Sequence, residues 1–419
     1  MTSRSSSMDL LVLCPHFAPD VAPTGTVMTA IVEGLGAAGH RLHVVTSLPW
    51  YRLHDVEPGW RGRPFRTEHV DWGRITRVYP FPTDKRNLRA RALGFAGFVG
   101  LVSMMAALAP RRPHAVLAMS PPLPIGVAGL AVARLRRAPF VFNIQDVFPD
   151  VAVELGLLTD RRVIRAAAAV ERFTYRQADA VTVLSDDLRD NVETKIGPRR
   201  GRCRTRVEVI PNFVDVERIR PAARENGYRR NHGLTGKIVV MYAGNVGLSQ
   251  SLGLIVHAAR ALRHRDDVVF VINGGGAARP GLEAEASDLE NLRFVDFQPP
   301  DRLAEVLAAA DLHVVPLKRG LATASVPSKL YSILAAGRPV LASVDPGTEV
   351  DRTLGRAKAG ISVAPDDPDA FLSALTRLVD DPPTLATMGD AGRRFVESWV
   401  SPAAVADQYA TLFSSLRTR

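Results

Sequence analysis

The chain has 419 residues, of which 46% are hydrophobic and 23% are charged, a composition that predicts folded domains and excludes intrinsic disorder. Its length favours two α/β domains over one. The formal net charge of +10 leaves two interpretations open. One is an anionic partner, such as nucleic acid, acidic lipid or a phosphorylated substrate, and the other is a surface of ordinary solvated arginines.

The cysteine content and the first residues bear on cellular location. The two cysteines, Cys14 in an apolar segment and Cys203 in a basic one, predict no disulfide framework and fit a reducing compartment. Residues 1–10 (MTSRSSSMDL) contain no apolar signal core. We therefore expect a cytoplasmic protein.

The first half of the chain alternates strand and helix patterns. Residues 10–14 (LLVLC) predict a buried parallel strand, and a proline-rich loop ending near Gly25 follows it. Apolar residues at helical spacing predict a helix over 26–38, and a strand is predicted over 41–46, which completes a βαβ unit. Further strands are predicted at residues 115–119, 140–144 and 180–184.

Residues 93–108 are apolar and uncharged, and arginines flank them on both sides. This run is shorter than the roughly 20 residues that a membrane-spanning helix needs. We expect either a buried core helix or a helix lying in the membrane interface. The flanking basic residues include Arg86, Arg89, Arg91, Arg111 and Arg112.

A second α/β series follows the basic loop at residues 197–204. Its strands are predicted at residues 238–242, 268–273, 292–297, 312–316, 340–343 and 360–363. The alternation predicts a parallel sheet covered on both faces. We therefore expect one Rossmann-like domain over residues 1–203 and another over 204–398. The last helix, within residues 399–419, could pack on either domain, including back onto the first.

Three loops are candidates for holding phosphate, because ligands of such sheets bind at the carboxyl ends of strands and near helix N-termini. The first loop ends at Gly25, and the second holds Gly244 and Gly247. Each of these two could equally be an ordinary turn. The third candidate is the start of the helix predicted near Pro327, with Ser325 or Ser328 near its cap.

Lys329 lies in the first turn of that predicted helix. A cation there is unfavourable, because the N-terminus of a helix carries partial positive charge. A bound anion therefore explains Lys329 better than helix stability does, and the alternative is a lysine that faces solvent.

The sequence predicts neither a metal site nor another cofactor. Asp367 and Asp369 form a D-x-D pattern, but they stand between a strand and a helix, where aspartates cap helices. The ten histidines show no zinc spacing.

The order of several motifs resembles family 4 of the retaining glycosyltransferases. They are "LGAAGHRLHVVT", "PNFVD", "YAGNVG", "FVDFQP", "AADLHVVPL", "PSKLYSILAAGRPVLA" and "DPDAFLSAL". The segments "NIQDVFPDVAVELGLL", "YAGNVGLSQSL" and "VPSKLY" resemble the N-acetyl-fucosamine transferase-like subgroup of bacterial O-antigen and capsule assembly.

The resemblance implies the GT-B fold, in which two Rossmann-like domains face a cleft. It also implies a nucleotide-sugar donor, expected to be a UDP-sugar, and no metal requirement. The expected acceptor is a polyprenyl-diphosphate-linked sugar or a glycan, used on the cytoplasmic face of the plasma membrane. The N-terminal domain would bind the acceptor, and the C-terminal domain the donor.

Several positions of the family pattern hold unusual residues here. An Arg and a Lys that commonly touch the diphosphate match Asn245 and Gln250. Two Glu near the donor sugar match Ala324 and Ser332, and a His before Asp146 matches Gln145. Asp146 and Lys329 are therefore the predicted catalytic residues. The predicted donor-binding residues are Gly25, Gly244, Asn245, Gln250, Phe297, Pro327, Ser328, Lys329 and Ser332.

Three other functions compete with sugar transfer. A non-hydrolysing UDP-sugar 2-epimerase would need acid–base groups, for which Asp146 and His16 are candidates. A homologue that binds nucleotide sugars without catalysis is also compatible with the uncharged residues at these family positions. Nucleic-acid binding is disfavoured, because aromatic residues make up only 6% of the chain and no helix combines them with basic residues.

Overall fold

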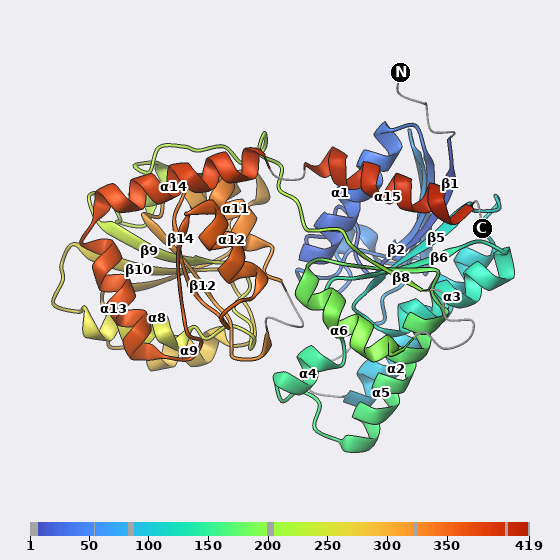
Figure 1. Ribbon diagram of the computed structural model, residues 1–419, viewed down its shortest axis with the longest axis horizontal. Helices are drawn as coiled ribbons and strands as arrows, with labels where there is room; N and C mark the ends of the chain where they lie inside the picture. The colour runs from blue at the N-terminus through green and yellow to red at the C-terminus, as the bar shows by residue number, and fades with distance from the viewer. Residues whose placement is uncertain are drawn as a thin grey trace. The chain divides into compact units, whose positions relative to one another are not determined.

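The computed structural model describes residues 7–53, 55–82, 88–198, 205–321, 326–398 and 401–417. The chain forms two compact units, Met1–Asn212 with Pro402–Arg419, and Phe213–Ser401. Each unit contains its own sheet, with helices on both faces (Figure 1). The two predicted α/β series are therefore two α/β domains.

Within the described residues, the first sheet has eight strands in the order β3-β4-β2-β1-β5-β6-β7-β8. Apolar runs without polar alternation form its central strands, because helices cover both faces. Its strands are β1 (Asp9–Leu13), β2 (Arg41–Ser47), β3 (Phe65–Val70), β4 (Gly73–Val78), β5 (Ala115–Ser120), β6 (Phe140–Ile144), β7 (Ala180–Val183) and β8 (Arg206–Val209). Its helices are α1 (Pro23–Ala37), α2 (Leu88–Ala107), α3 (Pro124–Arg136), α4 (Asp150–Glu154), α5 (Arg161–Gln177), α6 (Asp186–Ile196) and α15 (Pro402–Arg417), with a 3-10 turn at Pro58–Trp60.

The hairpin formed by β3 and β4 was not predicted from the sequence. β3 pairs antiparallel with β4, from Phe65↔Val78 to Val70↔Gly73, and lies at the edge of an otherwise parallel sheet. Its side chains are mostly exposed, so the segment carries no apolar run that would mark a buried strand.

The structure corrects the predicted domain boundary. β8 pairs in parallel with β7, from Ala180↔Arg206 to Val183↔Val209, so residues up to Asn212 belong to the first unit rather than to a second domain starting at 204. The last helix, α15, packs on α1 of the first unit. The buried hydroxyl of Tyr409 in α15 accepts a hydrogen bond from Asn143 Nδ2 in β6 at 2.8 Å.

The apolar segment predicted at 93–108 lies mostly within α2, which has two different faces. Phe98, Val102 and Ala106 are buried, and α2 packs on α3 and on the sheet. Met104 is 46% exposed, and Leu108, the residue after the end of the helix, is 71% exposed. The helix is therefore partly core and partly surface. Within the described ranges, no helix combines the length and apolar character needed to cross a membrane.

The second sheet has six strands within the described residues, in the order β11-β10-β9-β12-β13-β14. Neighbouring strands of this sheet pair in parallel throughout the described residues. Its strands are β9 (Ile238–Ala243), β10 (Val268–Asn273), β11 (Leu292–Val295), β12 (Leu312–Pro316), β13 (Val340–Ser343) and β14 (Gly360–Val363). Its helices are α7 (Gly227–Asn231), α8 (Gly253–Ala261), α9 (Arg279–Glu285), α10 (Leu303–Ala308), α11 (Lys329–Ala335), α12 (Glu349–Ala357), α13 (Pro368–Val379) and α14 (Pro382–Glu397), with a 3-10 turn at Pro300–Arg302.

Each sheet has one place where the strand order reverses. In the first sheet the chain proceeds outward in opposite directions from β1 and from β5, and in the second sheet from β9 and from β12. At such a switch point the neighbouring loops leave toward opposite sides and open a crevice at the carboxyl ends of the strands, where ligands of open α/β sheets bind. The fold therefore directs attention to the loops after β1, β5, β9 and β12.

Candidate functional site

Two glycine loops meet at the carboxyl ends of β9 and β10. The amide of Gly244, after β9, donates to the carbonyl of Asn273 at 2.9 Å, and the amide of Gly274, after β10, donates to the carbonyl of Val295 at 2.8 Å. Gly274 has a φ of +150°, and a Cβ atom there would lie 1.9 Å from the carbonyl oxygen of Gly244. Only glycine permits this approach, so the two loops form one continuous backbone surface.

The loop after β9 is held by its own side chains. Gly247 N donates to Gln250 Oε1 at 3.1 Å, and Gln250 Nε2 donates to Ser249 Oγ at 2.7 Å. Val246 N donates to the carbonyl of Gly275 at 2.9 Å, which ties this loop to the one after β10. Gln250, a predicted donor-binding residue, therefore shapes the loop in this structure, and it carries no charge to offer a phosphate.

Lys329 lies beside this backbone surface, although 85 residues separate it from Gly244 in the sequence. Its Nζ donates to Tyr242 Oη at 2.6 Å and lies 3.9 Å from the centre of the Tyr242 ring. A Cβ atom at Gly244 would lie only 3.1 Å from the same Nζ. The structure thus brings together the two predicted donor-binding residues Gly244 and Lys329.

The surroundings of Lys329 disfavour its charged form. Burial lowers the pKa of its amine to about 7. Tyr242 Oη donates a hydrogen bond to the carbonyl of Asn245 at 2.5 Å. Burial raises the pKa of this phenol. Among the described residues, no carboxylate forms an ion pair with Lys329. An anion bound here would therefore not compete with a carboxylate for the ammonium.

The helix start was predicted two residues too early. α11 begins at Lys329, and its preceding residue Ser328 makes no capping hydrogen bond with its side chain. Pro327 lies outside the helix, and its carbonyl accepts from Leu330 N at 3.2 Å. The N-cap role considered for Ser328 is therefore wrong for its side chain, because its φ and ψ are already helical.

The remaining donor-side predictions have different placements. Ser332 lies one turn after Lys329 in α11 and is half-buried. Phe297 is 59% exposed and follows β11, which ends at Val295 rather than at the predicted residue 297; its ring lies 3.6 Å from where a Cβ of Gly275 would stand. Ala324 and Ser325 lie outside the described residues.

Gly25 lies at the switch point of the first sheet, in the first turn of α1. A Cβ atom at Gly25 would lie 2.9 Å from the Cβ of His16, so glycine lets α1 pack against the loop after β1. His16 Nδ1 lies 2.7 Å from Asp20 Oδ2, and the other oxygen of Asp20 accepts from Tyr51 N at 3.2 Å. The structure gives Gly25 a packing role within the first unit.

Asp146 follows β6 at the carboxyl edge of the first sheet and is half-buried. The alternative that Asp146 caps the following helix is wrong, because α4 begins at Asp150 and its N-cap residue is Pro149. The preceding Gln145 is buried and donates from Nε2 to Asn143 Oδ1 at 2.9 Å.

The D-x-D pattern is a helix cap, as predicted. Asp367 precedes α13, and its side chain accepts from Ala370 N at 3.0 Å, while Asp369 lies in the first turn of α13. Within the described part of the chain, no cluster of three or more His, Cys, Asp and Glu side chains is placed to hold a metal ion.

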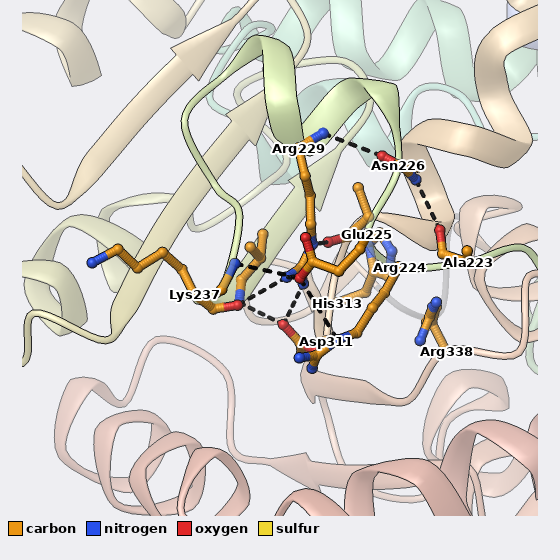
Figure 2. Close-up of polar contacts among 12 residues, drawn as sticks. Ala223, Arg224, Glu225, Asn226, Arg229, Lys237, Asp311, His313 and Arg338 are labelled. Atoms are coloured by element: carbon orange, nitrogen blue, oxygen red, sulfur yellow. Dashed lines mark hydrogen bonds and ion pairs between the residues drawn. The ribbon is translucent and has the colours of Figure 1, made fainter.

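A dense ionic network lies at the opposite, amino-terminal edge of the second sheet (Figure 2). Asp311, just before β12, accepts from Arg229 Nη2 at 2.5 Å, from Arg224 Nη1 at 2.6 Å and from Val239 N at 2.8 Å. Arg229 is fully buried and belongs to α7. Nearby, burial lowers the pKa of His313 to about 4. This network fastens α7 to the sheet and lies away from the strand ends that bind ligands.

Two contributors to the site were not predicted. Tyr242 carries the hydroxyl that contacts Lys329, and Gly274 supplies the backbone that meets Gly244. Gly274, Gly275 and Gly276 directly follow the strand predicted at residues 268–273. Their position directly after a predicted strand next to β9 was the signal that could have placed them at the site.

Comparison with protein families gives two matches that together follow the two units. Residues 24–212 match the Glycosyl transferase 4-like domain, and residues 237–381 match the Glycosyl transferases group 1 domain. WcaI of Escherichia coli K12, named for colanic acid biosynthesis and glycosyl transfer, is 28% identical over 382 residues. That match covers 88% of this chain and 91% of WcaI.

Solved structures are similar along nearly the whole chain. Sucrose-phosphate synthase from Thermosynechococcus elongatus has a TM-score of 0.77 and 19% identity, covering 98% of this chain and 99% of that one. HepE from Anabaena, solved in complex with UDP-glucose, has a TM-score of 0.70 and 15% identity, covering 98% of this chain and all (100%) of HepE. At these identities the likeness shows the fold alone, a GT-B fold of two Rossmann-like units.

Proposed function

Because the chain belongs to the family 4 glycosyltransferases with the GT-B fold, we propose that it transfers a sugar from a nucleotide-sugar donor to an acceptor in cell-surface polysaccharide biosynthesis. The reaction retains the anomeric configuration, as the family resemblance implies. The donor is a UDP-sugar, and the transferred group is a hexose or N-acetylhexosamine. The name of WcaI supports the polysaccharide role, and the UDP-glucose complex of HepE supports the choice of donor.

One observation carries this proposal: Lys329 and the Gly244 backbone converge at the switch point of the second sheet. A nucleoside diphosphate leaving group needs positive charge and N–H donors placed where its negative charge develops. Lys329 supplies the charge once an anion raises the pKa of its amine from about 7. Because residues 244 and 274 are glycines, the backbone of their loops can come close to a bound phosphate.

Leaving-group stabilisation by these groups needs no metal ion, so we expect activity in the presence of excess chelator. Lysine and backbone dipoles can neutralise a departing diphosphate as a divalent cation does elsewhere. The Asp367 side chain caps α13, and Asp369 lies in the first turn of that helix. Helix capping therefore explains the D-x-D pattern without a metal ion.

Asp146 serves the acceptor side in this proposal. It lies at the carboxyl end of β6, where residues of open α/β sheets contact ligands, and it orients or deprotonates the acceptor hydroxyl. Its half-buried position allows it to contact a substrate while the neighbouring Gln145 remains bound within the unit.

The acceptor is a polyprenyl-diphosphate-linked sugar or a growing glycan, reached at the inner face of the plasma membrane. Met104 in α2 and Leu108, which follows that helix, are exposed. In α5, three apolar side chains are exposed between exposed arginines: Val163, Val170 and Phe173. Apolar side chains between arginines are the composition of helices that lie in a membrane interface. The first unit would dock there through the region between Lys85 and Arg112, of which residues 83–87 lie outside the described residues.

The test is a donor screen with the full chain. Purified protein is supplied with UDP- and GDP-sugars and a polyprenyl-diphosphate-sugar acceptor, in excess chelator and in Mg²⁺. Labelled product that retains the donor's anomeric configuration supports the proposal. Conversion of the donor to its epimer would instead assign a 2-epimerase. Nucleotide binding with neither product would assign a non-catalytic homologue, and strict dependence on Mg²⁺ would contradict the metal-free mechanism.

A further inference from the structure

The donor site described above is short of positive charge. The two family positions that commonly carry a diphosphate-binding Arg and Lys hold Asn245 and Gln250, and Gln250 is bound within its own loop. Lys329 lies beside Gly244, but burial lowers the pKa of its amine to about 7. Arg279 donates to the carbonyl of Gly274 but is already paired with two carboxylates. A diphosphate carries at least two negative charges, so a second cation is expected nearby.

The switch point brings the loop after β12 next to the loop after β9. β9 and β12 are neighbours in the sheet, so both loops leave from adjacent strand ends. Lys318 is the second residue after β12, and its backbone N donates to the carbonyl of Ser249 at 3.1 Å. Lys318 therefore stands directly against the loop whose usual cations are replaced.

The backbone around Lys318 is held in place by acidic side chains from two further strand ends. Arg319 N donates to Asp366 Oδ2 at 3.0 Å, and Gly320 N donates to Asp345 Oδ2 at 2.8 Å. Asp366 also accepts a hydrogen bond from Ser251 Oγ, so one carboxylate links the loops after β9 and β12. Leu321 N closes the turn by donating to the carbonyl of Lys318 at 3.3 Å.

The side chain of Lys318 remains available, in contrast to its neighbour. The Arg319 guanidinium donates to the carbonyl of Pro365 at 2.9 Å. Lys318 is exposed, and among the described residues its ammonium has neither a carboxylate nor a hydrogen-bond acceptor. An ammonium on a flexible stem from a fixed backbone can reach a phosphate beside the loop and supply up to three donors.

We infer that Lys318 is a second phosphate-binding cation of the donor site, which acts with Lys329 on the diphosphate of the nucleotide and replaces the cations absent at Asn245 and Gln250. This inference rests on the proposed donor function and assigns a residue of that site. In this inference the Lys318 ammonium contacts the second phosphate of the nucleotide.

The test compares UDP with UMP, since the two differ by one phosphate. Affinities are measured by calorimetry for the wild type, Lys318→Ala, Lys318→Arg and the matched control Lys237→Ala. Lys237, a lysine of the same unit, precedes β9 at the opposite edge of the sheet (Figure 2). Its Nζ donates to the carbonyl of Asp266 at 2.6 Å. UDP binding also reports the proposed function: a wild type that binds neither UDP nor GDP overturns the donor assignment and this inference together.

Loss of one hydrogen-bonded charge predicts UDP binding weaker by about 10-fold to 100-fold in Lys318→Ala, with UMP binding within about 2-fold of wild type. Lys318→Arg should recover most of the lost affinity, and Lys237→Ala should lose none. If the wild type binds UDP but Lys318→Ala binds it equally well, the inference is wrong while the donor function stands. An equal loss for UDP and UMP would also overturn it, because the two nucleotides share the first phosphate, so the lost contact would not be one to the second phosphate.

Discussion

Burial makes the charged form of Lys329 unfavourable for folding, and the proposed donor site gives that charge a role in binding. The amine has a reference pKa of 10.5 and a pKa of about 7 in the folded chain. The unfolded chain therefore binds the proton more tightly, and stability rises as the pH increases from about 7 toward 10.5. Below this window the buried charge opposes folding, and a bound diphosphate would compensate it.

We predict that UDP affinity falls as the pH rises above about 7, because the amine loses the proton that attracts the phosphate. Lys329→Ala should weaken UDP binding and slow transfer by a factor on the order of 10²–10³. Lys329→Met should raise the Tm at pH 7, because it removes a buried charge without leaving a cavity. Calorimetry from pH 6 to 9 measures the first effect, and thermal unfolding measures the last.

Lys329→Arg is the control for that pH series. A guanidinium keeps its charge throughout, so the variant should lose the decline in affinity above pH 7. A wild-type UDP affinity that stays constant from pH 6 to 9 would show that Lys329 does not titrate at the site. Unchanged binding and rate in Lys329→Ala would remove Lys329 from the donor site.

Asp146 permits a second prediction that separates the acceptor side from the donor side. Asp146→Asn should lower the transfer rate by about 10²-fold or more, as loss of a general base does, while UDP affinity stays at the wild-type value. Asp190→Asn, at an exposed aspartate of the same unit, should change neither quantity. Normal turnover in Asp146→Asn would leave this residue with a purely structural role, which steady-state rates and calorimetry together can decide.

At the scale of elements, ionic contacts hold α7 on the second sheet. The fully buried Arg229 meets Asp311, and it also donates to the carbonyls of Ala309 at 2.8 Å and Lys237 at 2.9 Å. A buried guanidinium satisfied on several sides fixes the position of a short helix that has few residues to bury. The proposed donor site lies at the other edge of the same sheet, so the ionic network and the proposed site involve different loops and helices.

We predict that Asp311→Asn lowers the free energy of unfolding by about 1.5–3 kcal/mol, because the buried Arg229 then keeps only the exposed Glu225 as its counter-charge. Urea unfolding of the full chain measures this effect. Asp266→Asn, at an exposed aspartate nearby, should stay within about 0.5 kcal/mol of wild type. UDP affinity of folded Asp311→Asn should be unchanged, and a selective loss of UDP binding would instead place the network in the donor site.

At the scale of the whole molecule, two features bear on contact with a membrane. They are the net charge of +10 and the exposed apolar side chains of the first unit. α2 buries one face and exposes Met104, so it is neither wholly core nor wholly surface. Contact with anionic lipid would account for both the arginines and the exposed apolar groups. The alternative remains a core helix flanked by ordinary surface arginines.

We predict that liposomes containing anionic lipid sediment the protein at low salt and release it at high salt. Replacing Arg86, Arg89 and Arg91 with Ser should weaken this binding by up to about 3 kcal/mol, at about 1 kcal/mol for each basic residue near the surface. The side chains of these three residues lie outside the described ones. Leu108→Ser tests an apolar contact that is described, and unchanged thermal unfolding of each variant is the control. Wild-type protein that stays in the supernatant at low salt would contradict the docking.

The sequence by itself determined the elements and the family. β6, β10, β12, β13 and β14 have the predicted bounds. The first four are buried on both faces and are largely apolar runs that a local pattern reveals, whereas β14 is half-buried. The order of the motifs, from "PNFVD" to "PSKLYSILAAGRPVLA", was enough to indicate the family, because motifs record local chemistry. The β3–β4 hairpin was not predicted, because β3 is mostly exposed and carries no such run, although most of β4 is buried.

The tertiary structure decided which of these segments meet. Strand order places Lys329 against Gly244 and Tyr242, assigns β8 to the first sheet and packs α15 on α1. It also set the packing role of Gly25 and the bound state of Gln250. No local pattern contains this information, because contacts between residues far apart in the chain depend on the order and crossovers of the strands that carry them.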